Sequence, residues 1–374
     1  MRRALRSFAV LAALPAAAAA QGGLGVQGYG YPTGQISSAA LAVGGANAEV
    51  DAASQLNPAA VGLANRFAVY MQYQPEFRRT TIGGGTADAR TMRFPSFQIA
   101  GGQGRLTVAL SASTFLDRTW RNEYSDSVIV GGSYVPSTIV ASSEGAITDA
   151  RLAASYTLSP RVQVGVGFHA LVGKNDVEFG RNFPDSTGVG DVAQLSTMSY
   201  AGGAVSIGIV SAPIEGVLIG ASFRKGGSLE ARQSSTEVYQ GDAPDRLGLS
   251  VLYTGIPNTT FAARFDRTNW SAMRALGSAQ MSVFDANDLG LGVEVVGPRV
   301  AGVPSYARLG LRSRGLPFGA NGDQVSERSL SGGIGIPVAR GRGVIDLSLQ
   351  RATRSAAGAN ERAWSLGIGL GIKP

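Results

Sequence analysis

The sequence predicts an all-β fold, a 14-stranded antiparallel up-and-down transmembrane β-barrel with an N-terminal periplasmic plug, or hatch. Three features of the 374-residue chain lead to this prediction. Apolar residues recur with a period of two, and short connections alternate with long ones. After the first 20 residues, no apolar run has the length and composition of a spanning helix. A sheet in a bilayer must close, because every backbone N–H and C=O has to be paired within the protein.

Residues 1–20 are typical of a cleavable secretory signal. Arg2, Arg3 and Arg6 precede a mostly apolar run that ends in small residues such as Ala18 and Ala20. A membrane anchor is the alternative, but the run is short and rich in alanine. We therefore expect export, with cleavage just before Gln21.

Residues 21–65 form the predicted plug. The stretch is rich in glycine, alanine and serine, and it has no sustained period. A barrel of fourteen strands encloses a lumen that is too wide for its own side chains to fill, so a segment of this size is well placed to fold inside it. A disordered periplasmic tail is the alternative.

Residues 66–374 carry the predicted barrel. Val162, Val164, Val166 and Phe168 share one face of a strand, and the last strand of the chain repeats this alternation. The predicted strands are 66–75, 91–101, 105–118, 146–158, 161–175, 195–210, 216–227, 243–254, 257–268, 285–296, 303–313, 326–337, 343–353 and 361–372. The long connections between them are 76–90, 119–145, 176–194, 228–242, 269–284, 314–325 and 354–360. A soluble sandwich would also alternate apolar residues, but it has no reason to alternate short and long connections.

Aromatic residues near predicted strand ends suggest an interfacial girdle. They are Tyr70, Tyr73, Phe115, Trp120, Tyr156, Tyr253, Trp270 and Trp364. Ordinary packing in a β-core is the alternative for any one of them.

Composition argues against several other classes of protein. The net charge is +7, or +4 once the three arginines of the predicted signal are removed, and a small and dispersed charge does not indicate nucleic-acid binding. Cysteine is absent, so the chain has no disulfide and no thiolate metal site. We expect no metal and no cofactor, because there is one histidine and no regular acidic loop. That histidine, His169, has no serine–carboxylate arrangement that the sequence reveals, so we expect no enzymatic activity.

Several charged residues fall on the inward face of the predicted strands, and most should pair with one another across the wall. They are Asp149, Arg151, Arg224, Arg246, Arg264, Asp266, Asp288, Glu294, Arg308, Arg312 and Asp346. One or two arginines could instead bind a substrate carboxylate through bidentate hydrogen bonds. The candidates are Arg151, Arg224, Arg246, Arg264 and Arg308, and the sequence leaves the choice between them open.

The predicted plug resembles the hatch of the FadL-like family of outer-membrane transporters. Its run Ser38-Ala39-Ala40-Leu41-Ala42-Val43-Gly44-Gly45-Ala46 is followed by Asp51-Ala52-Ala53-Ser54-Gln55-Leu56-Asn57-Pro58-Ala59-Ala60. That family carries a small-residue and glycine stretch, then an Asp-Ala-Ser element, then Asn-Pro-Ala just before its first strand. The resemblance implies transport of a long-chain fatty acid or aromatic compound, released by movement of the plug or by a lateral opening of the wall. Asn57, Pro58 and Ala59 would then belong to the moving hatch element.

The same N-terminal pattern is similar to that of the PorV-like proteins, which are associated with type IX secretion. Binding of exported cargo is therefore a second hypothesis, and a general diffusion porin is a third. In each case we expect the protein in the cell outer membrane, with the lipid bilayer, the barrel-assembly machinery and a hydrophobic small molecule or the secretion machinery as partners.

Overall fold

The computed structural model describes residues 29–64, 67–82, 85–234, 236–276, 282–300, 302–320 and 322–372. The predicted signal and residues 21–28 and 65 of the predicted plug lie outside the described residues. The helices are short: α2 (Ser38–Ala42) and the 3₁₀ helices η2 (Pro58–Ala64), η3 (Asp185–Thr187), η4 (Trp270–Leu276) and η5 (Ala339–Gly341). Within these residues, none of the helices is long and apolar enough to cross a membrane.

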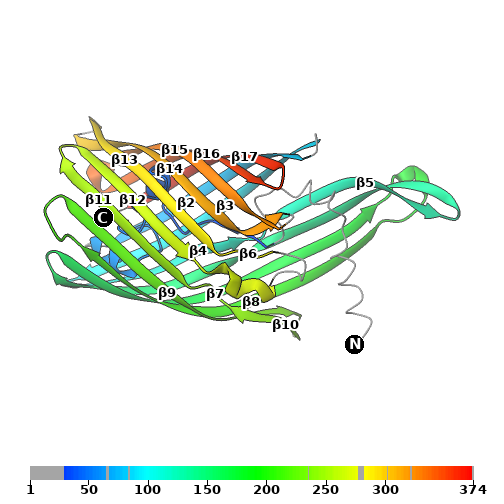
Figure 1. Ribbon diagram of the computed structural model, residues 1–374, viewed down its shortest axis with the longest axis horizontal. Coiled ribbons are helices and arrows are strands. Elements are labelled where there is room, and N and C mark those ends of the chain that lie inside the picture. Colours follow the sequence, from blue (N-terminus) through cyan, green and yellow to red (C-terminus); the bar gives the residue numbers. More distant parts are fainter. Residues whose placement is uncertain are drawn as a thin grey trace.

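Fourteen of the described strands form a closed antiparallel ring, in which β17 pairs with β2 (Figure 1). The ring consists of β2 (Ala68–Ile82), β3 (Gly85–Gln103), β4 (Leu106–Asp117), β6 (Ser133–Ser159), β7 (Val162–Asn182), β8 (Val192–Ser211), β9 (Val217–Gln233), β11 (Arg246–Ile256), β12 (Thr259–Thr268), β13 (Ala286–Val300), β14 (Val303–Ala320), β15 (Asp323–Val338), β16 (Gly343–Ala356) and β17 (Ala359–Ile372). Three further strands, β1 (Tyr31–Pro32), β5 (Trp120–Val130) and β10 (Thr236–Asp242), attach to β4, β6 and β9. The predicted fourteen-stranded barrel is confirmed, and each predicted strand overlaps one strand of the ring.

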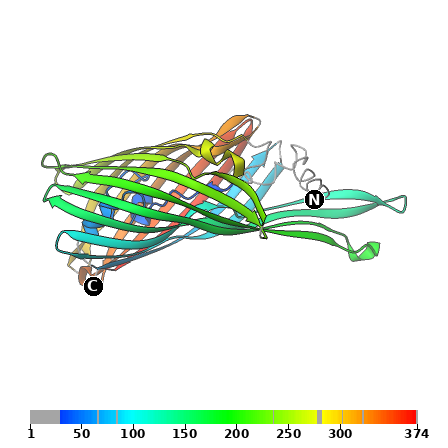
Figure 2. The same cartoon turned by 90° about the horizontal axis from the view of Figure 1, so that it is seen from below.

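The two ends of the barrel differ in the connections they carry. One end, called the turn end here, has short connections such as the one between Gln103 and Leu106. At the other end, called the loop end, several predicted loops are instead continuations of strands. The range 119–145 holds β5 and the first part of β6, and Figure 2 shows this hairpin projecting beyond the rest of the barrel. The sequence missed these extensions because they lack the regular apolar alternation of a lipid-facing strand.

Burial separates the two faces of each strand. On β11, Leu247, Leu249 and Val251 are exposed, whereas Arg246 and Ser250 are buried. Successive side chains of a strand point to opposite faces, so the aliphatic side chains cover the outside of the barrel and the polar ones face its interior.

The predicted aromatic girdle is wrong for three of its members. Tyr70, Phe115 and Trp270 are buried inside the barrel, and the Phe115 and Trp270 rings stack with centroids 5.3 Å apart. Tyr156 and Trp364 do face outward. Tyr70 and Phe115 lie in strands, where successive side chains alternate between the two faces, so a position near a strand end does not determine which face a side chain occupies. Trp270 lies outside the strands, as the first residue of η4.

Residues 29–64, called the inner segment here, run through the interior from the loop end to the turn end. Tyr31 and Pro32 pair with Asp117 and Leu116 at the loop end of β4. At the other end of the segment, η2 contacts β6, β7 and β8 near their turn ends. An apolar cluster that includes Tyr29, Phe115 and Trp270 packs at the loop end.

Candidate functional site

The Asn-Pro-Ala motif fastens the inner segment to the wall near the turn end. The Asn57 side-chain amide donates to the Glu49 carbonyl at 2.8 Å and to the Ile209 carbonyl of β8 at 3.0 Å. Its side-chain oxygen accepts from the Ala59 N–H at 2.9 Å. Pro58 follows as the first residue of η2, a position where its missing N–H leaves no hydrogen bond unmade.

The Asp-Ala-Ser element holds two turns of the inner segment together. The Asp51 carboxylate accepts from the Ser37 hydroxyl at 2.5 Å and from the Ser54 hydroxyl at 2.6 Å. Ser37 is also the N-cap of α2 and accepts from the Ala40 N–H. The carboxylate therefore fixes the spacing between α2 and the turn that precedes Asn57.

Wall glycines let the backbone of the inner segment lie directly against the strands. A Cβ atom at Gly310 of β14 would lie 2.6 Å from Val43 Cα, and one at Gly165 of β7 would lie 2.7 Å from Ala59 Cα. Real carbon–carbon contacts are about 3.5–4.0 Å, so these positions have no room for a side chain. The absence of Cβ atoms sets the path that the inner segment follows.

Ion pairs fill much of the space between the inner segment and the wall. Glu49 of the inner segment is fully buried and accepts hydrogen bonds from Arg246 and from Ser222. Arg246 also lies 2.5 Å from Asp266. Other inward pairs are Arg264–Asp288 at 3.1 Å, Arg312–Asp288 at 2.5 Å, Arg308–Glu294 at 2.6 Å, Arg308–Asp346 at 2.5 Å and Arg224–Asp149 at 3.7 Å. The prediction that most inward charges pair with one another is confirmed.

A second charged cluster at the loop end was missed. Arg354 lies 3.0 Å from Glu76, 2.6 Å from Glu327 and 2.5 Å from Glu361. Arg93, Arg314 and Arg354 each place a guanidinium about 5 Å from the Tyr31 ring centroid, at 5.0, 4.9 and 4.6 Å. Glu76, Arg314 and Arg354 fall in ranges that we expected to be external loops, so the unforeseen strand extensions concealed them.

The Tyr31 side chain ties the inner segment to this cluster. Its hydroxyl donates to Glu327 at 3.0 Å. Burial raises the pKa of the Tyr31 phenol, although Arg314 and Arg354 oppose that effect. The phenol therefore keeps its proton and can act as a donor to the carboxylate.

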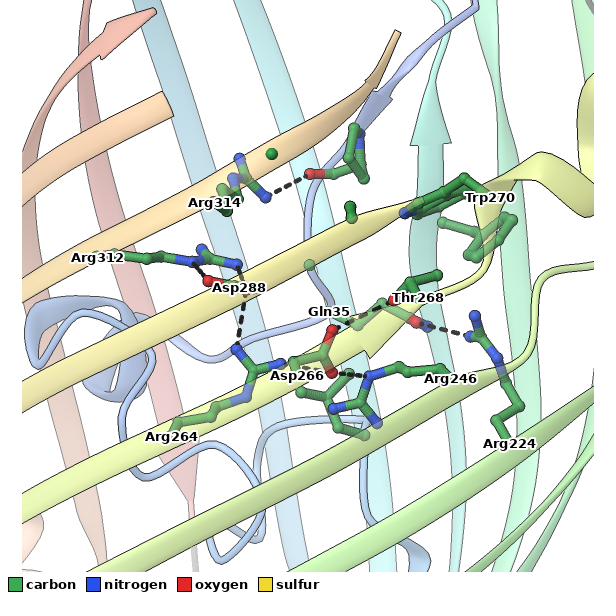
Figure 3. A pocket seen from close by; sticks show the side chains of 16 residues that line it. Gln35, Arg224, Arg246, Arg264, Asp266, Thr268, Trp270, Asp288, Arg312 and Arg314 are labelled. Atoms are coloured by element: carbon green, nitrogen blue, oxygen red, sulfur yellow. Dashed lines mark hydrogen bonds and ion pairs between the residues drawn. The ribbon is translucent and has the colours of Figure 1, made fainter. Parts of the chain in front are cut away.

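A cavity of about 60 Å³ remains between the inner segment, the arginines and the stacked rings (Figure 3). Its lining includes Gln35, Arg224, Arg246, Arg264, Asp266 and Trp270. A cavity needs at least about 10–15 Å³ to hold one water molecule, so this one holds a few waters at most. A long-chain ligand does not fit here while the inner segment stays in place.

Arg151 differs from the other four candidate arginines. It is 1% exposed, and its Nη2 donates one long hydrogen bond to Gln98 at 3.4 Å. Its Nε and Nη1 have no hydrogen-bond partner, and no carboxylate of the described residues lies within ion-pair distance. A buried guanidinium with unmade hydrogen bonds is costly, so Arg151 is the candidate arginine best suited to accept an anion from outside the chain.

His169 does have the serine and the carboxylate that the sequence did not reveal. Its ring contacts Asp149 of β6 and Ser206 of β8, each at 2.9 Å. The three residues are far apart in the sequence but adjacent in the sheet, because β6, β7 and β8 are neighbours. Strand register would have been needed to find them.

The wall has a seam between β3 and β4. Their ladder ends at the Ser96–Ser113 pair, although β3 extends to Gly85 and β4 to Asp117. Pro95 stands where the ladder ends, and proline cannot donate a ladder hydrogen bond. Beyond the last β3–β4 pair, toward the loop end, the short strand β1 pairs with β4 in place of β3. The Arg93–Asp117 ion pair at 2.5 Å bridges the two strands.

A groove of about 580 Å³ lies at this seam. Most of its lining is apolar, with Met71, Phe94, Phe97, Ile368 and Leu370 on the outer side. Gln72, Ser96 and Ser113 line it as well, and these three side chains are buried on the inner side of the wall. The groove therefore lies on the apolar outer face of the barrel, directly over wall residues whose side chains face the polar interior.

The described residues hold no cluster of three or more histidine, aspartate or glutamate side chains that could bind a metal ion. The charged groups of the interior are instead arranged as arginine–carboxylate pairs.

Known protein-family models and curated proteins give no match to this sequence. Solved structures do match. A FadL homologue from Pseudomonas aeruginosa has a TM-score of 0.64 at 11% identity, over 92% of this chain and 99% of that one. The monoaromatic hydrocarbon channel CymD has a TM-score of 0.53 at 13% identity, over 91% and 97%. The Pseudomonas putida toluene transporter TodX has a TM-score of 0.52 at 11% identity, over 94% and 97%. These likenesses establish a FadL-like barrel fold.

Proposed function

We propose that this chain, which has the barrel fold of FadL-like transporters, carries hydrophobic small molecules across the cell outer membrane. The seam between β3 and β4 is the observation that carries the proposal. Its groove of about 580 Å³ lies within the size range of small-molecule sites, and its lining is mainly apolar. A hydrophobic molecule that left the interior at this seam would enter the groove and then lipid without crossing water.

The inner segment acts as the hatch in this proposal. In the position described it occupies the interior, and the cavity beside it measures about 60 Å³, so a long-chain substrate passes this point only after the segment has moved. Asn57, Pro58 and Ala59 hold its turn-end half, and the Tyr31 contacts hold the loop end. A filled lumen of this kind argues against a general diffusion porin.

Arg151 is proposed as the residue that binds a substrate carboxylate. Gln98, which accepts from Arg151, lies two residues along β3 from Ser96 in the lining of the groove. Two residues of a strand span about 7 Å, so a fatty acid whose carboxylate binds Arg151 could extend its apolar tail into the groove. This favours an amphipathic carboxylate, such as a long-chain fatty acid, over a plain aromatic hydrocarbon.

Uptake measurements test both parts of the proposal. Cells that lack the native protein would express the wild-type chain, Ala112→Phe, which fills the groove, or Ala263→Phe, which places the same side chain on the exposed face of β12. We expect fatty-acid uptake to fall with Ala112→Phe and to stay normal with Ala263→Phe. Normal uptake with Ala112→Phe at equal expression would contradict the seam as the route.

A role in binding exported cargo is the second candidate, and the projecting hairpin favours it. Ile129, Tyr134 and Leu195 are 60–78% exposed near the outer ends of β5, β6 and β8. Repeated co-purification of large exported proteins, together with normal uptake in a deletion strain, would support this role instead. Export through a cleaved signal and insertion by the barrel-assembly machinery belong to both candidates.

A further inference from the structure

Asp149, His169 and Ser206 form a hydrogen-bonded chain inside the barrel that transport does not require. His169 Nδ1 lies 2.9 Å from both carboxylate oxygens of Asp149, and His169 Nε2 lies 2.9 Å from Ser206 Oγ. A carboxylate can only accept, so Nδ1 carries the proton and Nε2 accepts from the serine hydroxyl. A serine held by a histidine that is oriented by a carboxylate is the arrangement that activates a nucleophile.

The surrounding wall is shaped to permit these contacts. A Cβ atom at Gly167 would lie 2.5 Å from Ser206 Oγ and 3.4 Å from His169 Nε2. A side chain at this position would therefore prevent the serine from reaching the histidine. On the other side, Gln35 of the inner segment donates to Asp149 at 2.9 Å and fixes the carboxylate.

Arg151 supplies unused donors next to His169. It stands directly opposite His169 in the pairing of β6 with β7. Its Cδ lies 3.6 Å from the point that a Cβ atom at Gly167 would occupy. Its Nε and Nη1 have no hydrogen-bond partner. Hydrogen-bond donors already in place beside a nucleophile can stabilise the negative oxygen that forms when the nucleophile attacks a carbonyl.

We propose that these residues are a serine esterase site for small apolar carboxylic esters. Ser206 Oγ attacks the ester carbonyl carbon while His169 Nε2 takes its proton, and Arg151 holds the negative oxygen. The carbon–oxygen bond to the alcohol then breaks, and the alcohol leaves with the proton from His169. Water then attacks the carbonyl carbon of the acyl-Ser206 ester and gives a proton to His169 Nε2. His169 returns that proton to Ser206 Oγ as the acyl–oxygen bond breaks and the acid is released.

The inner segment controls access to this site. Ser206 and His169 are 3% and 7% exposed, and the Asn57 side chain packs against Gly208, two residues from Ser206 on β8. An ester therefore reaches Ser206 when the inner segment moves away. The activity does not depend on the proposed transport, since a small ester needs to enter the interior but not to cross the wall.

A fluorophosphonate probe tests the proposal on the intact, purified chain in detergent. The probe forms a phosphorus–oxygen bond with an activated serine and releases fluoride. We expect mass mapping to find the label on Ser206, and we expect no label after Ser206→Ala. His169→Gln keeps the serine but removes its base, so labelling should slow by about 100-fold or more. Ser348→Ala is the control, because Ser348 is an equally buried serine on β16 without a histidine contact.

Hydrolysis of p-nitrophenyl butyrate provides a second measurement. Its rate should fall by about 100-fold or more in Ser206→Ala, His169→Gln and Asp149→Asn, and it should stay at the wild-type value in Ser348→Ala. Should Ser206→Ala fail to fold, His169→Gln decides the question. An unlabelled wild-type chain, a label on another serine, or labelling that does not depend on His169 would overturn the proposal. Fatty-acid uptake by the same variants tests the transport proposal separately. Normal uptake without serine labelling would overturn only the esterase proposal, and labelled Ser206 without uptake would overturn only the transport proposal.

Discussion

A single methyl group on the wall should loosen the inner segment. In Gly310→Ala, the new Cβ would lie 2.6 Å from Val43 Cα and closer still to backbone atoms of Val43 and Gly44. Carbon atoms in contact are about 3.5 Å apart or more, so the inner segment must move by about 1 Å at Val43 alone. A Cβ atom is fixed rigidly to its strand, and the atoms that it meets belong to the backbone of the inner segment. A change of side-chain rotamer therefore cannot relieve the clash.

Overpacking of this kind costs about 1–3 kcal/mol. If the cost falls on the docked position of the inner segment, the displaced state should become about 5- to 150-fold more populated, since 1.4 kcal/mol is a factor of ten. Current through single barrels in a planar lipid bilayer measures this population directly. We expect Gly310→Ala to open more often than the wild-type chain by a factor in that range.

Gly332→Ala is the matched control. Gly332 lies on the neighbouring β15, where a Cβ atom has its nearest contact at 3.5 Å, to the Arg308 carbonyl. This variant adds the same methyl group without a clash, so its opening frequency should equal that of the wild-type chain. Equal opening of Gly310→Ala and the wild type, or an equal increase in both variants, would refute the reasoning.

Three other variants test the interior. Asn57→Ala removes the hydrogen bonds to the Glu49 and Ile209 carbonyls, at about 1 kcal/mol for each bond, and should raise the opening frequency in the same bilayer assay. Arg354→Leu leaves Glu76, Glu327 and Glu361 buried without their shared cation, and should destabilise the barrel by about 3–5 kcal/mol or more in urea unfolding; an unchanged midpoint would contradict the structural role of the cluster. Deletion of residues 21–65 should give a barrel that conducts ions continuously, whereas conductance equal to that of the intact chain would rule out a plug.

The sequence was informative about the ring of strands for a physical reason. Every strand that crosses a bilayer must present apolar side chains to lipid, so its period-two pattern is strong and local. The alternation at Leu247, Leu249 and Val251 is enough to identify β11 and its outward face. No long-range information is needed for such a strand.

The interior was harder to predict, because its contacts join residues far apart in the sequence. Glu49 meets Arg246, and Tyr31 meets Glu327, only because the inner segment follows one particular path through the barrel. The wall glycines that define the path, such as Gly165 and Gly310, look like any other strand glycine in the sequence. Arg151 could be recognised as the unpaired arginine only after every neighbouring acid had been placed.

The chemistry of the contacts around the inner segment bears on the proposed transport. Besides apolar packing, the segment is held by buried pairs such as Glu49–Arg246 and by the Asn57 amide. A hydrophobic substrate cannot replace these polar contacts, because it offers neither charge nor hydrogen bonds. A plug held mainly by apolar packing would instead compete with every lipid tail that entered the lumen. If the proposed transport is right, this polar attachment keeps the barrel closed in the presence of lipid tails. A substrate that promotes opening should then carry a group that can compete for hydrogen bonds, such as the carboxylate of a fatty acid or the carbonyl of an ester near Arg151.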